Sequence, residues 1–307
     1  MKFAYAFRRT AFYPYDGGTG WEIPPKEVRG KYLKKVREIG FEGIEVGLGQ
    51  GVGTSEAEIK ELGKELDAAG VPCAAVRGGG GFTRPFTAAK SRAAVTGAVK
   101  MAAWIGANLI NMTVTMPSGH PAGLVGGGVG GFTSPGSSKT ATAADYEVTA
   151  NELRTLADFA ANHGVDISIE LHQHSIADTS WSCLHLLDLI DRPNVGLNPD
   201  LGNLYWHYET PEETLEHAIV AIAPKTRYWH CKQLQRVQIP ELEKSYFQLV
   251  PLPDGEIDYR FSIAAMLDAG YDGWLSIEGF RYGDQIRGDQ RSVAYCKELI
   301  AELRAER

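Results

Sequence analysis

Strand-like and helix-like patterns alternate along the whole chain, and this alternation limits the fold more than any other feature. Eight short apolar runs are typical of strands, and the stretches between them place apolar residues three and four positions apart, as amphipathic helices do. Repeated strand–helix units predict a parallel sheet of the α/β class. The predicted strands are 3–7, 43–48, 72–76, 109–114, 167–172, 195–199, 228–232 and 275–279.

Several of the predicted helices end at a glycine that precedes the next strand. Glycine at this place supplies the left-handed C-terminal cap, and the chain has it at Gly40, Gly70, Gly106, Gly164 and Gly270. The regular pattern leaves no composition break or linker. A length of 307 residues also suits one α/β barrel of about 250 residues with insertions. The sequence therefore predicts a single domain over residues 1–307.

The last four predicted strands each end with a side chain that can bind a metal ion. Successive side chains of a strand point to opposite faces, so Ile167 and Ile169 oppose Glu170 in the run ISIELH. A polar face is costly in an open sheet covered by helices on both sides, whereas a closed barrel collects polar strand ends at one mouth. The sequence therefore predicts a (β/α)8 TIM barrel with a divalent-metal site formed by Glu170, Asp200, His230 and Glu278.

The predicted ligands form an oxygen-rich set with one nitrogen. This set suits Mn²⁺ best and is compatible with Mg²⁺, Co²⁺ or Zn²⁺. An octahedral ion with four protein ligands would keep two positions for a substrate that offers a carbonyl and a neighbouring hydroxyl. The metal would neutralise the charge of the developing enediolate, and Glu170 or Glu278 could act as the general base from opposite faces of a sugar carbon.

Other polar residues share the faces of the predicted metal ligands. Lys232, two residues after His230, is predicted either to polarise a substrate carbonyl or to pair with a metal carboxylate. His172, two residues after Glu170, is predicted to take part in catalysis. Glu45 in the second strand is predicted either to bind a substrate hydroxyl or to be a buried structural carboxylate.

Two glycine-rich loops follow predicted strands, where a barrel keeps its chemistry. One is 77–81, after the third strand. The other, 117–139 after the fourth strand, is long enough to act as a lid and carries His120 as a candidate proton donor. A flexible insertion without function is the alternative. A phosphate-binding loop is disfavoured, because Ser138 instead of glycine precedes Lys139.

Composition excludes several classes of protein. A net charge of −7 argues against a nucleic-acid partner and suits a small neutral substrate. The four cysteines are widely separated and form no CxxC pair, which favours reduced thiols and a cytoplasmic location. The chain has neither the apolar core of a secretory signal nor a membrane-spanning run of about 20 apolar residues. We expect a homo-oligomer.

The segment from Ile167 to Phe280 resembles the sugar phosphate isomerase/epimerase group of the xylose-isomerase-like barrels, which includes the ketose 3-epimerases. The run PLPDGEIDYRFSIAAMLDAGYDGWLSIEGF (251–280) is similar to the C-terminal stretch of that group. The resemblance implies a sugar isomerase or epimerase. It also implies that the two glutamates at positions 170 and 278 exchange the proton, and that Arg236, six residues after His230, binds the substrate.

One position departs from the epimerase pattern. These enzymes usually have a histidine three residues after the metal aspartate, where this chain has Asn203. Asn203 is then expected to contact the substrate. The missing proton donor would have to be His172, Lys232 or His120, or else the reaction is a different one.

We weigh three other functions against this one. The C-glycoside deglycosidases resemble the same superfamily, cleave 3-oxo glycosides by elimination and work with a small partner subunit. The aromatic residues in 7–15, with Trp21, could accept a planar aglycone or could simply pack the first loop. A nuclease of the endonuclease IV type is disfavoured, because it would need more histidines and a basic surface, and the chain shows neither clearly. A sugar sensor without catalysis is the last alternative.

Overall fold

The fold is described from a computed structural model. The described residues are 1–6, 8–9, 19–51, 53–116, 136–173, 175–206, 211–242, 244–279 and 283–307. The predicted lid segment falls largely on 117–135, and that part lies outside the described residues, as do His120 and most of the aromatic segment 7–15.

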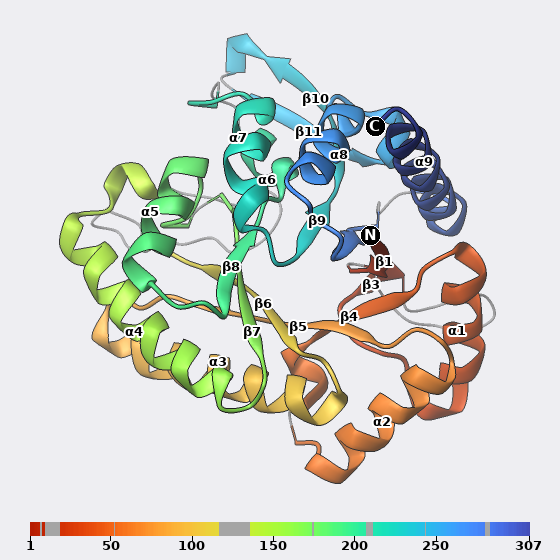
Figure 1. Cartoon of the computed structure of the whole chain (residues 1–307), viewed down its shortest axis with the longest axis horizontal. Coiled ribbons are helices and arrows are strands. Elements are labelled where there is room, and N and C mark those ends of the chain that lie inside the picture. The colour runs from red at the N-terminus through yellow and green to blue at the C-terminus, as the bar shows by residue number, and fades with distance from the viewer. Residues whose placement is uncertain are drawn as a thin grey trace.

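Eight parallel strands form one curved sheet, in the order β8-β7-β6-β5-β4-β1-β12-β9. A parallel bridge between Leu197 and Thr226 and a hydrogen bond from the Arg227 N–H to the Leu197 carbonyl connect the two ends of the sheet. The nearly closed ring confirms the predicted TIM barrel (Figure 1). All eight predicted strands are present: β1 Lys2–Tyr5, β4 Gly43–Gly47, β5 Cys73–Gly80, β6 Leu109–Val114, β7 Asp166–Glu170, β8 Val195–Asn198, β9 Trp229–Cys231 and β12 Trp274–Ile277.

Helices surround the ring of strands (Figure 1). They are α1 Lys26–Ile39, α2 Glu56–Ala68, α3 Pro85–Ile105, α4 Ala143–Ala161, α5 Ser180–Ile190, α6 Leu201–Tyr205, α7 Leu215–Ile222, α8 Tyr259–Asp268 and α9 Gln285–Ala305. The shorter 3₁₀ segments are η1 Leu48–Gly51, η2 Ser138–Thr140, η3 Ala223–Lys225, η4 Pro240–Leu242 and η5 Leu252–Asp254.

The glycines predicted to end helices have the expected conformation. Gly40, Gly70, Gly106, Gly164 and Gly270 all have positive φ, between 68° and 115°. Only glycine reaches this region without steric cost, so it can reverse the chain directly into the next strand. In the described part of the chain, every helix–glycine–strand boundary that we predicted is therefore confirmed.

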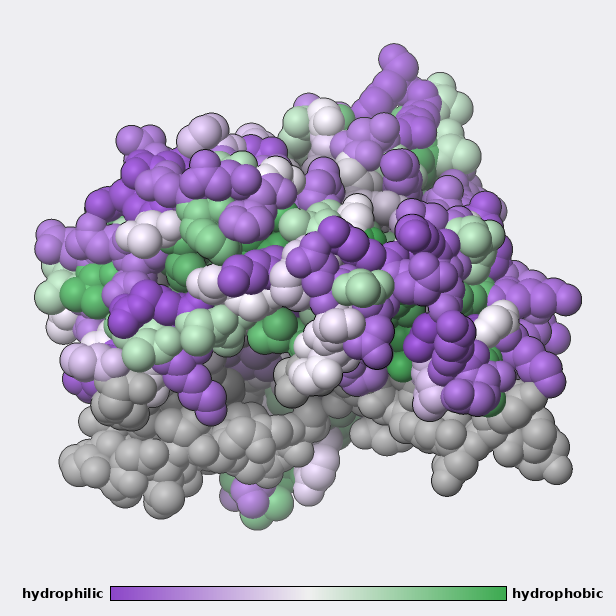
Figure 2. Space-filling view, turned by 90° about the horizontal axis from the view of Figure 1, so that it is seen from below, coloured by the Kyte–Doolittle hydropathy of each residue, from purple (hydrophilic) through white to green (hydrophobic). Residues whose placement is uncertain are grey.

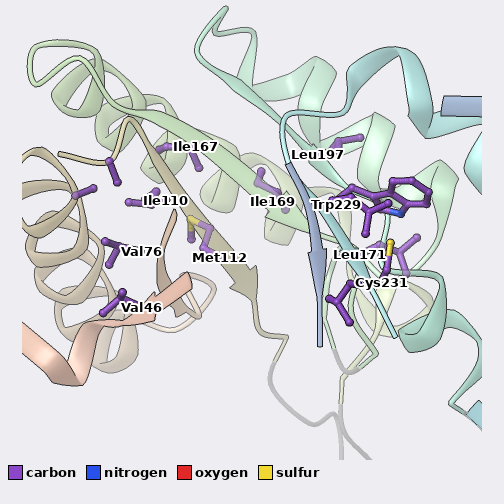
Figure 3. Close-up of a cluster of buried hydrophobic side chains, with 14 of the residues drawn as sticks. Val46, Val76, Ile110, Met112, Ile167, Ile169, Leu171, Leu197, Trp229 and Cys231 are labelled. Atoms are coloured by element: carbon purple, nitrogen blue, oxygen red, sulfur yellow. The ribbon is translucent and has the colours of Figure 1, made fainter. Parts of the chain in front are cut away.

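Alternation along the strands separates the outer core from the barrel interior. Figure 3 shows side chains of the outer core, among them Val46, Val76, Ile110, Ile167, Ile169 and Leu197, all of them fully buried. Burying one such side chain contributes about 1.5–3 kcal/mol to stability. A separate small cluster consists of Ala4, Ala74, Ala75, Leu109 and Tyr228. Polar residues on the opposite faces of the strands point into the barrel interior, where they can form a site.

Two parts of the fold differ from the predictions. Strand β5 continues to Gly80, so Arg77 belongs to a strand and not to a loop. The chain also forms an antiparallel hairpin of β10 Gln233–Ile239 and β11 Lys244–Val250, which was not predicted from the sequence. The hairpin extends beyond the helices at the top of Figure 1. A second antiparallel pair joins β2 Arg8–Arg9 to β3 Thr19–Gly20.

Among the described residues in Figure 2, hydrophilic ones predominate, and hydrophobic ones lie between them in small groups. Within the described residues, no helix combines the length and the apolar character that crossing a membrane requires.

Candidate metal centre

The four predicted metal ligands meet at the carboxyl ends of neighbouring strands. Glu170 is the last residue of β7, Asp200 follows β8 and caps α6, His230 lies in β9, and Glu278 directly follows β12. One ligand atom from each side chain lies within 4.8 Å of the others, and all four residues are buried. The structure thus brings together four side chains that are up to 108 positions apart in the sequence.

The imidazole of His230 lies between Glu45 and the other three predicted ligands. Its Nε2 lies 2.6 Å from Oε2 of Glu45, so the carboxylate accepts a hydrogen bond from the ring. Its Nδ1 makes no hydrogen bond within the described residues. Nδ1 instead faces Glu278 Oε1 at 3.5 Å, Glu170 Oε1 at 3.6 Å and Asp200 Oδ2 at 3.9 Å. Metal-binding histidines characteristically donate their second ring N–H to a carboxylate, so the four residues fit a divalent cation.

The electrostatics of the cluster favour a cation. Burial opposes the charged form of His230, but the carboxylates of Glu45 and Glu170 outweigh it and raise the pKa of His230 to about 10. Burial raises the pKa of Asp200 to about 7, even though Lys232 lies beside it. Several carboxylates therefore share a space away from water, and a bound cation would compensate for their charge.

Glu170 is held by three side chains from other parts of the barrel. Arg77 Nη1 donates to Oε2 at 2.8 Å, Asn111 Nδ2 to the same oxygen at 3.1 Å, and Asn203 Nδ2 to Oε1 at 3.0 Å. Burial works to raise the pKa of Glu170, but the charges of Arg77 and then His230 hold this pKa well below its usual value. The Arg77 guanidinium also stacks on Trp21 at 4.5 Å.

Arg77 and Asn111 also belong to the site but were not predicted as site residues. Both have a signal that could have revealed them. Arg77 follows Cys73 and Ala75 at a spacing of two, on a strand that continues further than we predicted. Asn111 is the one amide within the apolar strand LINMTV and is fully buried. A polar side chain inside such a strand needs a partner, and the barrel interior provides it.

Lys232 connects three groups of the site. Its Nζ donates to Asn203 Oδ1 at 2.7 Å, Asp200 Oδ2 at 2.9 Å and Glu278 Oε2 at 3.2 Å. Lys232 therefore lies beside two of the predicted metal carboxylates, and both of its predicted roles stay predictions. Asn203 accepts from Lys232 and donates to Glu170, so this amide links the two sides of the cluster at the position where the epimerases usually have histidine.

Replacing Lys232 with methionine should reduce the stability of the metal-free protein. The substitution would leave Asp200 and Glu278 buried without their cation, which typically costs about 3–5 kcal/mol. Urea unfolding with a chelator present measures the change in the free energy of unfolding. The matched control is Lys60→Met, because Lys60 forms an exposed ion pair with Glu56, and such pairs contribute about 0–1 kcal/mol. A loss below about 1 kcal/mol for Lys232→Met would contradict the bridging role.

The remaining predicted site residues have different surroundings. Glu45 is fully buried and contacts His230, and both of its predicted roles stay predictions. His172 is half-buried, its Nδ1 lies 2.6 Å from the Gln173 carbonyl oxygen, and burial lowers its pKa. Arg236 lies on β10 with its guanidinium 4.4 Å from the ring centre of Tyr205. His120 lies outside the described residues.

A family model described as "Xylose isomerase-like TIM barrel" matches residues 33–299. The chain belongs to this family. Its curated relatives include L-ribulose 3-epimerase of Methylomonas sp. (strain DH-1), 27% identical over 42% of this chain and 40% of the relative. Another is 2-oxo-tetronate isomerase of Pectobacterium atrosepticum, 28% identical over 49% of this chain and 52% of the relative. A third is 3-dehydroshikimate dehydratase of Bacillus anthracis, 24% identical over 42% of this chain and 48% of the relative.

These alignments therefore span about half the length of each curated relative or less. Solved structures show the same fold over nearly the whole chain. A xylose isomerase-like TIM barrel protein from Mycobacterium smegmatis, in complex with magnesium, has a TM-score of 0.74 at 22% identity, covering 98% of this chain and 97% of its own. D-psicose 3-epimerase from Clostridium cellulolyticum has a TM-score of 0.72 at 17% identity, covering 98% and 99%. The predicted resemblance to this family is confirmed. The relatives are epimerases, isomerases and a dehydratase, which is consistent with an enzyme.

Proposed function

We propose that the protein is a divalent-metal-dependent isomerase or epimerase that moves a proton next to the carbonyl group of a sugar. The observation that carries the proposal is the pair of buried glutamates, Glu170 and Glu278, each with one oxygen about equally close to the Nδ1 of His230, at 3.6 and 3.5 Å. Two carboxylates in one buried centre can remove a proton and return it. The epimerases and isomerases among the relatives support this reaction class.

Glu170, Asp200, His230 and Glu278 would hold the metal. A divalent cation there would neutralise negative charge that develops on the substrate oxygens. We propose Mn²⁺ because the donor set has three carboxylates and one imidazole, and Mg²⁺, Co²⁺ and Zn²⁺ are also compatible with it. The magnesium in the M. smegmatis relative supports a hard divalent ion.

The surroundings of the two glutamates suit proton transfer. Arg77, Asn111 and Asn203 stabilise the ionised form of Glu170 and fix its orientation. Lys232 binds Oε2 of Glu278, which leaves Oε1 on the side of His230. Around the nearly closed barrel the strands follow in the order β7, β8, β9 and β12. Glu170 ends β7 and Glu278 follows β12, so two strands separate the two carboxylates. The two carboxylates can therefore approach one sugar carbon from different directions.

Proton exchange with solvent tests the proposal. The Mn²⁺-loaded protein is incubated in D₂O with a panel of ketoses and 3-oxo glycosides, and NMR follows the carbon next to each carbonyl. We expect deuterium at that carbon, together with the isomer or epimer, for at least one compound. A chelated sample should show none, because the charge on the substrate oxygens would no longer be stabilised.

Three outcomes would change the proposal. Release of an aglycone from a 3-oxo glycoside would replace the isomerase with the lyase, for which Asn203 in place of histidine leaves room. Tight binding of a sugar without any exchange would indicate a sensor. Exchange that is equally fast in the chelated sample would remove the metal from the mechanism.

The single domain, the homo-oligomer, the partner subunit of the lyase and the cytoplasmic location stay predictions.

A further inference from the structure

An aromatic wall stands beside the metal centre. We use this name for Tyr205 and Trp206 at the end of α6 together with Arg236 and Phe247 of the β10–β11 hairpin. The guanidinium of Arg236 lies 4.4 Å from the ring centre of Tyr205, and the ring centres of Trp206 and Phe247 are 6.1 Å apart at 50°. Arg236 and Phe247 are directly paired across the hairpin, so one face of it carries both toward α6.

Lys232 connects the aromatic wall to the metal centre. Its Nζ lies 5.5 Å from the ring centre of Trp206 and 3.2 Å from Oε2 of Glu278. The indole is therefore separated from a proposed proton-transfer carboxylate by a single ammonium group. All four residues of the wall are partly exposed, whereas the metal ligands behind them are buried.

The chemistry of this wall favours a flat ligand. Aromatic faces stack on other rings, and an arginine stacked on tyrosine keeps its charge while presenting a flat surface. A free monosaccharide bound between Glu170 and Glu278 would make its contacts with the metal and with hydrogen-bonding groups of the metal centre. A ring attached to that sugar would extend past Lys232 and meet the indole of Trp206.

We propose that the aromatic wall is a subsite for a second ring, joined to the sugar that reacts at the metal centre. This inference rests on the proposed function and names its substrate class, which is a glycoside whose reacting ring carries a carbonyl, such as a 3-oxo glycoside, and not a free monosaccharide. The second ring is either an aromatic aglycone or another sugar, because both offer the flat apolar face that stacks on an indole. Trp206 is the residue that binds it.

Equilibrium binding to the full-length Mn²⁺-loaded protein tests the subsite. Isothermal titration calorimetry compares the 3-oxo forms of phenyl β-glucoside (phenyl glucoside), cellobiose and methyl β-glucoside (methyl glucoside), which share a glucose ring that carries the carbonyl. We expect Trp206→Ala to weaken phenyl glucoside binding about tenfold, the loss of one stacking contact. Methyl glucoside should change less than about twofold, since it has no second ring. Trp206→Phe should restore part of the lost affinity because it returns a flat ring.

The matched control is Trp181→Ala. Trp181 is 62% exposed on α5 and stacks on His185, so its loss should leave all three affinities unchanged. If Trp206→Ala loses affinity for phenyl glucoside alone, the second ring is an aromatic aglycone. If it also loses affinity for cellobiose, the second ring can be a sugar. Both results support the subsite. Equal weakening of phenyl and methyl glucoside, or no binding of phenyl glucoside by the wild type, overturns it. Ring-dependent binding without proton exchange would instead refute the proposed function and leave the subsite in place.

Discussion

Replacing Glu278 with glutamine is expected to reduce turnover by about 10³-fold or more. The amide keeps the size of the side chain and can still accept a hydrogen bond from Lys232, so the fold should persist. It cannot take up a proton from carbon, because an amide is far less basic than a carboxylate. Steady-state kinetics on the substrate found by the exchange experiment measures the loss, and circular dichroism checks the fold.

The two glutamates give this prediction a sharper form. If each one serves one epimer, Glu278→Gln should stop deuterium exchange from one epimer and Glu170→Gln from the other. Loss of the metal would stop both exchanges in both variants, so the pattern separates proton transfer from metal binding. Glu302→Gln is the matched control, because Glu302 forms an exposed ion pair with Arg260. Turnover above about a tenth of the wild-type value in Glu278→Gln would refute its role as a base.

Replacing His230 with alanine is expected to abolish metal-dependent stabilisation. A ligand at about 100 times its Kd stabilises a folded protein by about 2.7 kcal/mol, so Mn²⁺ should raise the Tm of the wild type above that of a chelated sample. His230→Ala removes the only nitrogen among the four proposed ligands and should lose this shift. Differential scanning calorimetry with Mn²⁺ and with chelator measures it.

Two further variants define how specific that loss is. His163→Ala is the matched control, since His163 is exposed just after the end of α4 and its Nδ1 lies 2.9 Å from the Phe159 carbonyl oxygen. Glu45→Gln should weaken Mn²⁺ binding by about 10–100-fold without abolishing it, because Glu45 orients the imidazole but is not a proposed ligand. A full metal-dependent shift in His230→Ala would place the metal elsewhere.

Most of the fold could be predicted from local patterns. Alternation of period two marked the strands and the face on which Glu170 lies, because successive side chains of any strand point in opposite directions. The glycines at helix ends were predictable for an equally local reason, since a left-handed cap depends on one residue. The length of a strand was harder to predict. The third strand was predicted to end at residue 76, but β5 continues through the glycines 78–80, which have low strand propensity and yet pair with β6.

The hairpin and its residues were beyond such patterns. The resemblance to the epimerases implied that Arg236, six residues after His230, binds the substrate. In the structure the hairpin carries Arg236 onto Tyr205, so the aromatic wall depends on how β10 pairs with β11 and packs on α6. Spacing in the sequence contains no information about that pairing.

The sequence by itself determined the eight strand–helix units, the helix ends and the four side chains that a metal would need. Each of these follows from backbone geometry over a few residues. Only the tertiary structure decided how those side chains are held. Glu45 and His230 are 185 positions apart, and Arg77 and Glu170 are 93 apart. Such partners meet because barrel closure sets the register between strands, which is a property of the whole sheet and not of any one segment.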